Sequence, residues 1–152
     1  MTGTNLQDNL NWLLIRASML TKQRLMKLAE EYDLTLMQAM TLCLIEPGIP
    51  VPMSIISELL TCDPSNVTGI VERLSVGSYI ERRESPADRR VKTITLTTPG
   101  EALRDKLLPR ITGYDTPNLH DLSQNEINTL KNLLLKLVPA TSVTKPDHPI
   151  AK

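Results

Sequence analysis

A change of hydrophobic period near residue 78 constrains this sequence more than any other feature. Before it, apolar residues recur every three to four positions, which is the spacing of amphipathic helices. After it come two short β-rich runs, and in the second run Ile94 and Leu96 alternate with threonines. The cluster Ser-Pro-Ala-Asp at residues 85–88 separates the two runs and favours a turn. Residues 79–97 are therefore predicted to form a β-hairpin inside an otherwise helical chain.

Four helices are predicted before this hairpin, and the first three are described here. The longest covers residues 6–31, where leucines recur at helical spacing. Thr35 followed by Gln38 has the pattern of a capping box, so a second helix starts there. The prolines within residues 47–52 end that helix, because proline lacks a backbone donor and restricts the residue before it. A third, short helix is expected over residues 54–60.

The fourth helix, over residues 63–76, opens with the pair Asp63-Pro64. We expect the Asp63 side chain to accept hydrogen bonds from free N–H groups of the first turn, where Pro64 loses nothing by lacking a donor. Gly77 is the expected left-handed residue that ends the helix. The predicted inward face consists of Val67, Ile70, Val71 and Leu74.

Two further helices are predicted after the hairpin. The fifth begins at Thr98-Pro99 and is expected to break within residues 113–119, which contain Gly, Asp, Pro and Asn. Ser123 with Glu126 forms a second capping box and opens the sixth helix. The polar residues from 139 onward are expected to be a disordered tail. The apolar positions of the sixth helix are Ile127, Leu130, Leu133, Leu134 and Leu137.

The overall charge does not fit a generic polyanion binder, because 17 basic residues are matched by 17 acidic ones. Positive charge is instead concentrated in residues 77–97, where five basic side chains stand against three acidic ones, a net charge of +2. No apolar run approaches the ~20 residues needed to span a bilayer, so no membrane partner is expected. Two cysteines and two histidines are too few for a disulfide framework or a His/Cys metal site. Residues 1–10 show no secretory signal, and we expect a cytoplasmic protein.

Two helices joined by a tight turn and followed by a hairpin describe a winged helix-turn-helix, whose second helix enters the DNA major groove. In this sequence that recognition helix is the one over residues 63–76. Its first turns carry small polar groups that can approach bases or phosphates, and a helix N-terminus favours a phosphate. The predicted DNA contacts on this helix are Ser65, Asn66, Thr68, Gly69 and Arg73.

The predicted contacts on the hairpin tip, the wing, are Asp88, Arg89 and Arg90. An arginine on a thin wing can enter the narrow minor groove, where the potential is most negative. Simpler interpretations remain open, because polar residues early in a helix often only cap it and arginines on a turn are often only solvated. Asp88 and Arg90, two positions apart on one strand, could form an exposed ion pair of little energetic weight. The order of all these features along one short stretch favours DNA binding.

These segments resemble the MarR family of transcriptional regulators. The Asp-x-Arg of the wing, here Asp88 and Arg90, is the most specific feature of that family. The resemblance covers about residues 5–138, although Ser78 stands where the family usually places a glycine. The similar segments, from the helix before the turn to the entry of the helix after the wing, are residues 56–60, 63–74, 80–83, 86–90 and 96–100.

The resemblance implies a mainly α fold with a small β-hairpin, a winged helix-turn-helix with long terminal dimerisation helices. It implies a homodimer whose two lobes meet successive major grooves of a pseudo-palindromic operator in double-stranded DNA. The implied function is a sequence-specific transcriptional regulator, most simply a repressor that a ligand releases. The implied organisation is a dimerisation helix in residues 1–34, a DNA-binding lobe in 35–98, further dimerisation helices in 99–138 and a tail in 139–152.

The resemblance also implies a small aromatic or anionic effector, bound between the dimer helices and the lobe, and no cofactor. Trp12, Arg16 and Met19 are the candidate ligand residues, because Trp12 can stack and Arg16 can pair with a carboxylate. A packed tryptophan and a surface arginine are the alternative interpretation. Some relatives sense oxidants through cysteine, and here the candidates are Cys62, beside a helix N-terminus, and Cys43, on an apolar helix face.

No catalytic constellation is visible, so we do not expect an enzyme. Serine, histidine and aspartate are linked by no motif, and no glycine-rich phosphate loop exists. The recognition helix has a formal charge of −1 from Asp63, Glu72 and Arg73. That weak charge keeps an alternative open, a winged-helix protein–protein interaction module without operator binding.

Overall fold

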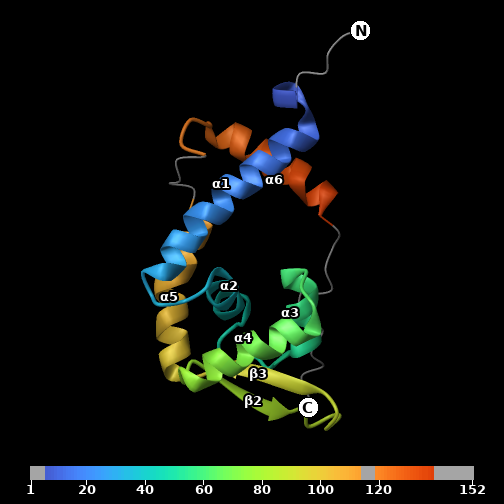
Figure 1. The fold of residues 1–152 in the computed structure, drawn as a ribbon, viewed down its shortest axis with the longest axis vertical. Helices are drawn as coiled ribbons and strands as arrows, with labels where there is room; N and C mark the ends of the chain where they lie inside the picture. The colour runs from blue at the N-terminus through green and yellow to red at the C-terminus, as the bar shows by residue number, and fades with distance from the viewer. Residues whose placement is uncertain (1–5, 114–118, 139–152) are drawn as a thin grey trace.

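A computed structural model describes residues 6–113 and 119–138 of the chain. Two of its helices, α1 (Leu10–Glu30) and α6 (Gln124–Leu137), lie at one end of the molecule, and a compact lobe lies at the other (Figure 1). The long helix α5 (Thr98–Thr112) leaves the lobe and runs toward the terminal helices. The lobe contains α2 (Leu36–Leu44), α3 (Met53–Leu60), α4 (Pro64–Val76) and a small sheet. This arrangement confirms the predicted fold class.

The sheet has three antiparallel strands in the order β1-β3-β2. The predicted hairpin is confirmed as β2 (Ile80–Glu84) and β3 (Lys92–Leu96), with Ile80 opposite Leu96. The third strand, β1 (Val51–Pro52), was not predicted. It has only two residues and ends in a proline, so no period marks it in the sequence, and it exists as a strand only because it pairs with β3.

The core of the lobe lies between α2, α3, α4, α5 and the inner face of the sheet. The predicted inward face of α4 is confirmed, since Val67, Val71 and Leu74 are each 1% exposed and Ile70 is half-buried against the same core. Each neighbouring element contributes at least one fully buried side chain to the same cluster: Leu42, Ile56, Ile94 and Leu107. This packing fixes α4 on the lobe, with its opposite face turned outward.

The first predicted helix is interrupted near its start. Residues Leu6–Asp8 form a single 3₁₀ turn, and α1 begins only at Leu10. The reason is local, because the side-chain oxygen of Asn9 accepts a hydrogen bond from the backbone N–H of Trp12 at 3.2 Å and caps the helix there. The capping boxes at the starts of α2 and α6 are both confirmed.

The predicted left-handed residue at the end of α4 is wrong by one position. Gly77 has a right-handed φ of −71°, and Ser78 takes the left-handed conformation with φ of +60°. Gly77 is needed for another reason, because a Cβ atom there would lie 2.8 Å from the ring of Tyr79. The backbone N–H of Ser78 donates to the carbonyl of Ser75 at 2.9 Å, and that of Tyr79 donates to the carbonyl of Leu74 at 3.0 Å, so the helix ends with Ser78 as its left-handed residue.

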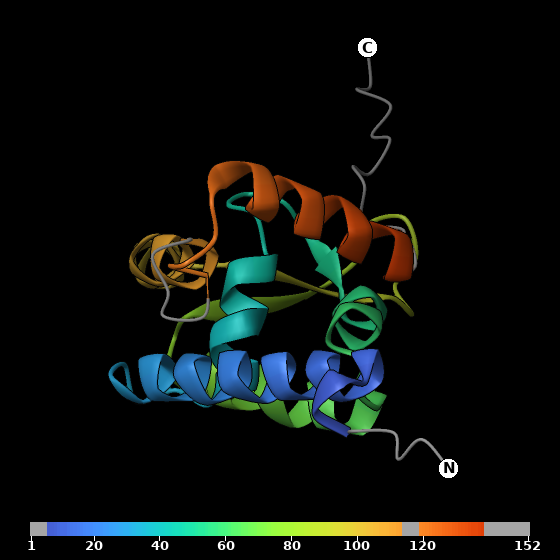
Figure 2. The same cartoon turned by 90° about the horizontal axis from the view of Figure 1, so that it is seen from above.

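The two terminal helices bury little of their apolar surface. In α1 only Leu28 and Ala29 are buried, and in α6 only Ile127 is. Figures 1 and 2 together show that α1 and α6 cross in one view but run along opposite sides of the molecule in the other. A groove of about 550 Å³ between these helices and the end of α5 is lined mainly by apolar side chains, among them Leu130, Leu134 and Leu135.

Some predictions fall on segments that are not described. α5 ends at Thr112, in agreement with the predicted break, but residues 114–118 lie outside the described residues, as does the predicted tail over 139–152. The division of the chain at residues 34, 98 and 138 stays a prediction. In the described part of the chain, no helix is long and apolar enough to cross a membrane.

Candidate nucleic-acid interface

The turn between α3 and α4 is held by short-range hydrogen bonds. Thr61 ends α3 in the left-handed conformation, with φ of +49°. The backbone N–H of Cys62 donates to the carbonyl of Ser57 at 3.1 Å, and the Ser57 hydroxyl donates to the carbonyl of Cys62 at 2.6 Å. This pair of bonds closes the turn, so α4 is presented at a fixed angle to α3 as a helix-turn-helix requires.

The outer face of α4 carries the predicted contact residues. Ser65, Asn66 and Arg73 are exposed, and Thr68 and Gly69 are half-buried. The hydroxyl of Thr68 donates to the carbonyl of Pro64 at 3.1 Å, so part of its hydrogen-bonding capacity is used within the helix. A Cβ atom at Gly69 would meet no atom within 4 Å, which leaves the helix backbone open to a close approach there. The structure thus brings all five residues to one accessible helix.

The start of α4 differs from the prediction in one detail. Asp63 is the N-cap residue, but its side chain makes no capping hydrogen bond. Its backbone carbonyl instead accepts from the N–H groups of Asn66 and Val67, at 3.0 and 3.2 Å. The exposed Asp63 carboxylate and Glu58 both line an open hollow beside the turn. The positive charge that DNA requires must therefore come from elsewhere in the lobe.

The wing supplies this charge at an ordered tip. The backbone N–H of Arg90 donates to Oδ1 of Asp88 at 2.9 Å, and Nε of Arg90 donates to the same oxygen at 3.4 Å. The Arg90 side chain is 92% exposed. Asp88 and Arg90 lie in the turn between β2 and β3, so the prediction that they share one face of a strand is wrong. Asp88 orients Arg90 because its carboxylate closes the turn, and not because of strand alternation.

The ion pairs of the hairpin identify a basic residue that sequence reasoning missed. Lys92 pairs with Glu84 across the strands at 2.6 Å, and Arg83 pairs with Glu81. Among the described residues, no carboxylate pairs with the exposed Arg82 or with Arg89. Arg82 lies opposite the apolar Ile94 on the neighbouring strand. An apolar residue at that position offers no negative charge, so the charge of Arg82 is left uncompensated across the hairpin. The net positive charge of the hairpin is thus carried by Arg82 and Arg89.

Comparison with known proteins agrees with this geometry. The MarR family model matches residues 34–92, from the start of the lobe to the wing. The multiple antibiotic resistance protein MarR of Escherichia coli is 29% identical over 129 residues, which cover 79% of this chain and 87% of that protein. The transcriptional repressor NicR of Pseudomonas putida is 28% identical over 106 residues, 70% of this chain and 67% of that protein.

The structural comparison includes a complex with nucleic acid. The crystal structure of a mutant E. coli MarR with operator DNA has a TM-score of 0.75 and 25% identity, and covers 91% of this chain and 100% of that chain. The chain is thus similar to the MarR family of transcriptional regulators, in sequence over residues 34–92 and in fold over most of its length. It is accordingly a DNA-binding transcriptional regulator of the winged helix-turn-helix type. CouR of Rhodococcus jostii, with a TM-score of 0.81 and 24% identity over 92% of this chain and 99% of that chain, supports the fold alone.

The predicted effector residues of this chain lie apart from its large groove. Trp12 is half-buried, Arg16 is exposed and Met19 is 59% exposed. None of the three lines the groove between α1, α5 and α6, which α1 borders with Ala17, Thr21 and Arg24 instead. The three residues thus lie on other sides of α1 than the one that borders the groove, and their role in binding an effector stays a prediction.

The two cysteines occupy different surroundings. Burial raises the pKa of the Cys43 thiol to about 11, against a smaller opposite effect of Arg104, so this thiol stays protonated at neutral pH and reacts poorly. Cys62 is half-buried in the helix-turn-helix turn and packs against the lobe core. These surroundings make Cys43 a poor candidate for oxidant sensing.

Proposed function

We propose that this chain is a homodimeric repressor that binds a pseudo-palindromic operator through α4 and the wing and is released by a small effector. The proposal rests on one observation: two surfaces, one for DNA and one for a second copy, are both exposed in the same chain. One is the polar face of α4 beside a wing with a net positive charge. The other is the apolar surface of the terminal helices at the opposite end of the molecule.

The homodimer is supported by the size of the uncovered apolar surface. Leu10 is 68% exposed, Leu13 50%, Leu133 53% and Leu135 64%. Monomeric soluble proteins rarely expose a contiguous apolar patch of this kind. We propose that the terminal helices of a second copy cover these side chains and fill the groove of about 550 Å³. The two lobes then project from one end of the dimer toward neighbouring major grooves.

The DNA contacts are divided between the two parts of the lobe. Asn66 presents an exposed amide on the first turn of α4, and amides of this kind read base edges in the major groove. Arg90, oriented by Asp88, extends from the wing and is suited to the minor groove. Arg82 and Arg89 add uncompensated charge for phosphates. Base reading is therefore assigned to α4, and electrostatic attraction to the wing.

The proposed effector-binding residues are those predicted from the sequence on α1. Trp12 and Arg16 lie one helical turn apart on α1, so a ring stacked on Trp12 can place its carboxylate near Arg16, beside Met19. If so, Arg16→Ala leaves operator affinity unchanged and weakens release by salicylate, which is used as the probe. An unchanged response to salicylate would remove Arg16 from the site.

The test of the DNA proposal is a set of binding isotherms on two duplexes, the DNA upstream of the chain's own reading frame and a scrambled version, at two salt concentrations. Asn66→Ala is expected to lose roughly 1–3 kcal/mol on the upstream DNA and little on the scrambled duplex. Arg90→Ala is expected to weaken both and to lower the salt slope by about one. Asp88→Ala should resemble a milder Arg90→Ala.

Arg83→Ala is the matched control for the wing, because Arg83 is already paired with Glu81 on the same hairpin. If Arg90→Ala binds both duplexes like the unmodified protein, the wing is not a DNA contact. If the protein forms no complex whose affinity falls with salt, the interaction module without operator binding is the better interpretation. The negative formal charge of the recognition helix is the observation that favours that second candidate.

A further inference from the structure

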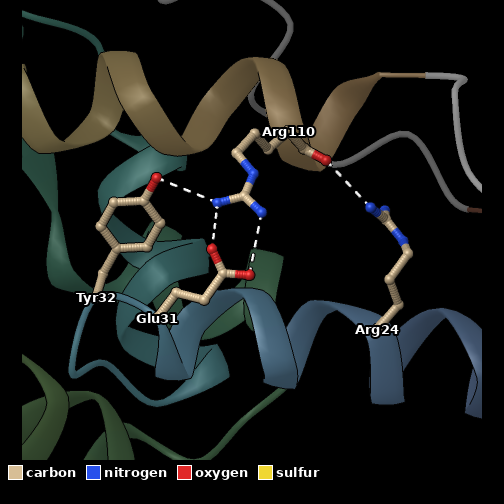
Figure 3. Close-up of polar contacts among 4 residues, drawn as sticks. All are labelled: Arg24, Glu31, Tyr32 and Arg110. Atoms are coloured by element: carbon tan, nitrogen blue, oxygen red, sulfur yellow. Dashed lines mark hydrogen bonds and ion pairs between the residues drawn. The ribbon is translucent and has the colours of Figure 1, made fainter.

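A polar cluster joins the end of α1 to the end of α5 (Figure 3). The two terminal nitrogens of Arg110, on α5, donate to the two carboxylate oxygens of Glu31 at 2.6 and 3.1 Å. One of them also donates to the hydroxyl of Tyr32 at 3.3 Å. From α1, the Arg24 guanidinium donates to the backbone carbonyl of Arg110 at 3.1 Å. We call the group of Arg24, Glu31 and Arg110 the clasp.

The clasp holds one residue of α5 at two points of α1. Arg24 and Glu31 are seven residues apart, which is two helical turns, so they lie on the same face of α1 about 10 Å from each other. Arg24 binds the main chain of Arg110, and Glu31 binds its side chain. Leu28, between them on that face, is only 5% exposed. Two contacts separated along one helix restrict the angle between the helices as well as their distance.

The clasp lies where the terminal helices meet the DNA-binding lobe. Tyr32 starts the connection from α1 to α2, packs against the lobe core and is followed by the left-handed Asp33. α5 is anchored in the same lobe through Leu107, which is fully buried. Beyond this junction α1 rises away from the lobe (Figure 1), and most of its side chains up to Met26 are exposed. The clasp therefore lies at the point where α1 leaves the lobe, so a small change of angle there moves the far end of α1 by a larger distance.

The charges around the clasp make it sensitive to the loss of one carboxylate. A cavity of about 190 Å³ beside it is lined by Arg24, Lys27, Leu28, Glu31 and Arg110. Three cations thus share a small space with one carboxylate, and removing that carboxylate leaves like charges facing one another. Because the Glu31 and Arg110 side chains are about half exposed, their pairing contributes little to the free energy of unfolding. Its geometry can still restrict orientation, since a bidentate arginine–carboxylate pair is directional.

We propose that the clasp is a positioning device that sets the angle between α1 and the winged lobe, and with it the separation of the two α4 helices in the dimer. A helix of the length of α1 spans about 30 Å, so a tilt of about 10° at its base moves its far end by about 5 Å. That displacement exceeds the rise of one base pair, about 3.4 Å. The second half of this inference rests on the proposed function, because it requires the homodimer.

The experiment measures distances between spin labels by pulsed electron paramagnetic resonance in the full chain, with Cys43→Ala and Cys62→Ser as background. Labels at Lys22→Cys on α1 and Val76→Cys on α4, diluted into unlabelled protein, give the distance within one chain. A label at Val76→Cys alone, where the side chain is 87% exposed, gives the distance between protomers. The two test variants are Glu31→Gln and Arg110→Lys. Glu31→Gln removes the carboxylate charge, and Arg110→Lys keeps the positive charge but loses the bidentate fork. Glu30→Gln, a neighbouring exposed carboxylate on the same helix, is the matched control.

The unmodified protein and Glu30→Gln are expected to give narrow distributions at both distances. Glu31→Gln and Arg110→Lys are expected to shift or broaden both by about 5 Å, with helix content and the thermal midpoint nearly unchanged. Within-chain distributions identical in all four proteins would overturn the clasp. A missing distance between protomers in the unmodified protein would instead contradict the proposed dimer, and the within-chain distance would still decide whether the clasp sets the angle.

Discussion

At the scale of single residues, Tyr79 links three parts of the lobe. Its ring lies over Gly77 at the end of α4, and its carbonyl accepts a hydrogen bond from the N–H of Thr97 at 3.0 Å. The same carbonyl lies against Gly100 in the first turn of α5, where a Cβ atom would be only 1.9 Å from the oxygen. Glycine is required at position 100 because backbone, and not a movable side chain, fills the space.

Gly100→Ala is therefore expected to lower the free energy of unfolding by about 3 kcal/mol or more, since the helix and the hairpin must separate to admit the methyl group. Urea unfolding at fixed protein concentration measures this. Gly69→Ala is the control, because a Cβ atom there meets nothing within 4 Å and alanine favours a helix interior by roughly 0.5–1 kcal/mol. Equal unfolding midpoints for the two variants would contradict the packing argument.

Ser78 adopts the left-handed backbone conformation, which lowers the stability of the folded lobe. A residue with a Cβ atom loses about 1–2 kcal/mol in the left-handed region, and glycine does not. Ser78→Gly is expected to raise the free energy of unfolding by about 1 kcal/mol, after the greater chain entropy of glycine in the unfolded state is subtracted. Gly77→Ala should act in the opposite direction, because its methyl group meets the Tyr79 ring. A Ser78→Gly protein less stable than the unmodified one would show that the serine makes a compensating contact.

At the scale of elements, the start of α6 depends on one ionised carboxylate. Hydrogen bonds donated by the Ser123 hydroxyl and backbone N–H, at 2.7 and 2.8 Å, lower the pKa of Glu126 below its usual value. The pKa of Glu31 is lowered in the same direction, first by its hydrogen bonds from Arg110. For both groups the folded state binds protons less readily than the unfolded state. Their stabilisation is therefore present above the ordinary glutamate pKa and is lost as the pH falls through the folded value.

Glu126→Gln keeps a side chain that can complete the capping box but removes the titration. The thermal midpoint of the unmodified protein is expected to exceed that of Glu126→Gln at pH 7, and the difference is expected to shrink as the pH falls below about 4.5. Calorimetry at pH 7, 5 and 3 measures this, with Glu30→Gln as the control for the loss of one surface charge. A difference that grows at low pH would contradict the assigned direction.

At the scale of the whole molecule, the apolar faces of α1 and α6 are largely uncovered, and the proposed homodimer would bury them. Light scattering at micromolar concentration is expected to give about twice 17.0 kDa. Leu135 lines the groove and is 64% exposed, so Leu135→Glu should weaken the dimer while leaving the lobe folded. Val76→Glu is the matched control, because Val76 is 87% exposed but lies on the lobe. A monodisperse monomer of the unmodified protein that still bound DNA would rule out the dimer.

Local signals in the sequence were sufficient for most element boundaries and for the site helix. The capping boxes at Thr35 and Ser123 and the pair Asp63-Pro64 each act within three or four residues, so they place a helix start without knowledge of the rest of the fold. The exposure of Asn66 and Arg90 also follows from local pattern, because the opposite positions are apolar or form a turn. These are interactions between neighbours in the chain, and the sequence alone encodes them.

Features that depend on partners distant in the chain are set by how the elements pack together. The two residues of β1 become a strand because β3 offers them hydrogen bonds. Gly100 must be a glycine because the backbone carbonyl of Tyr79, far earlier in the chain, fills the space where a Cβ atom would stand. Glu31 and Arg110 are 79 positions apart, and no period relates them. A sequence pattern reports which face of an element is apolar, but the pairing of charges across elements depends on how those elements pack, and packing is a property of the whole chain.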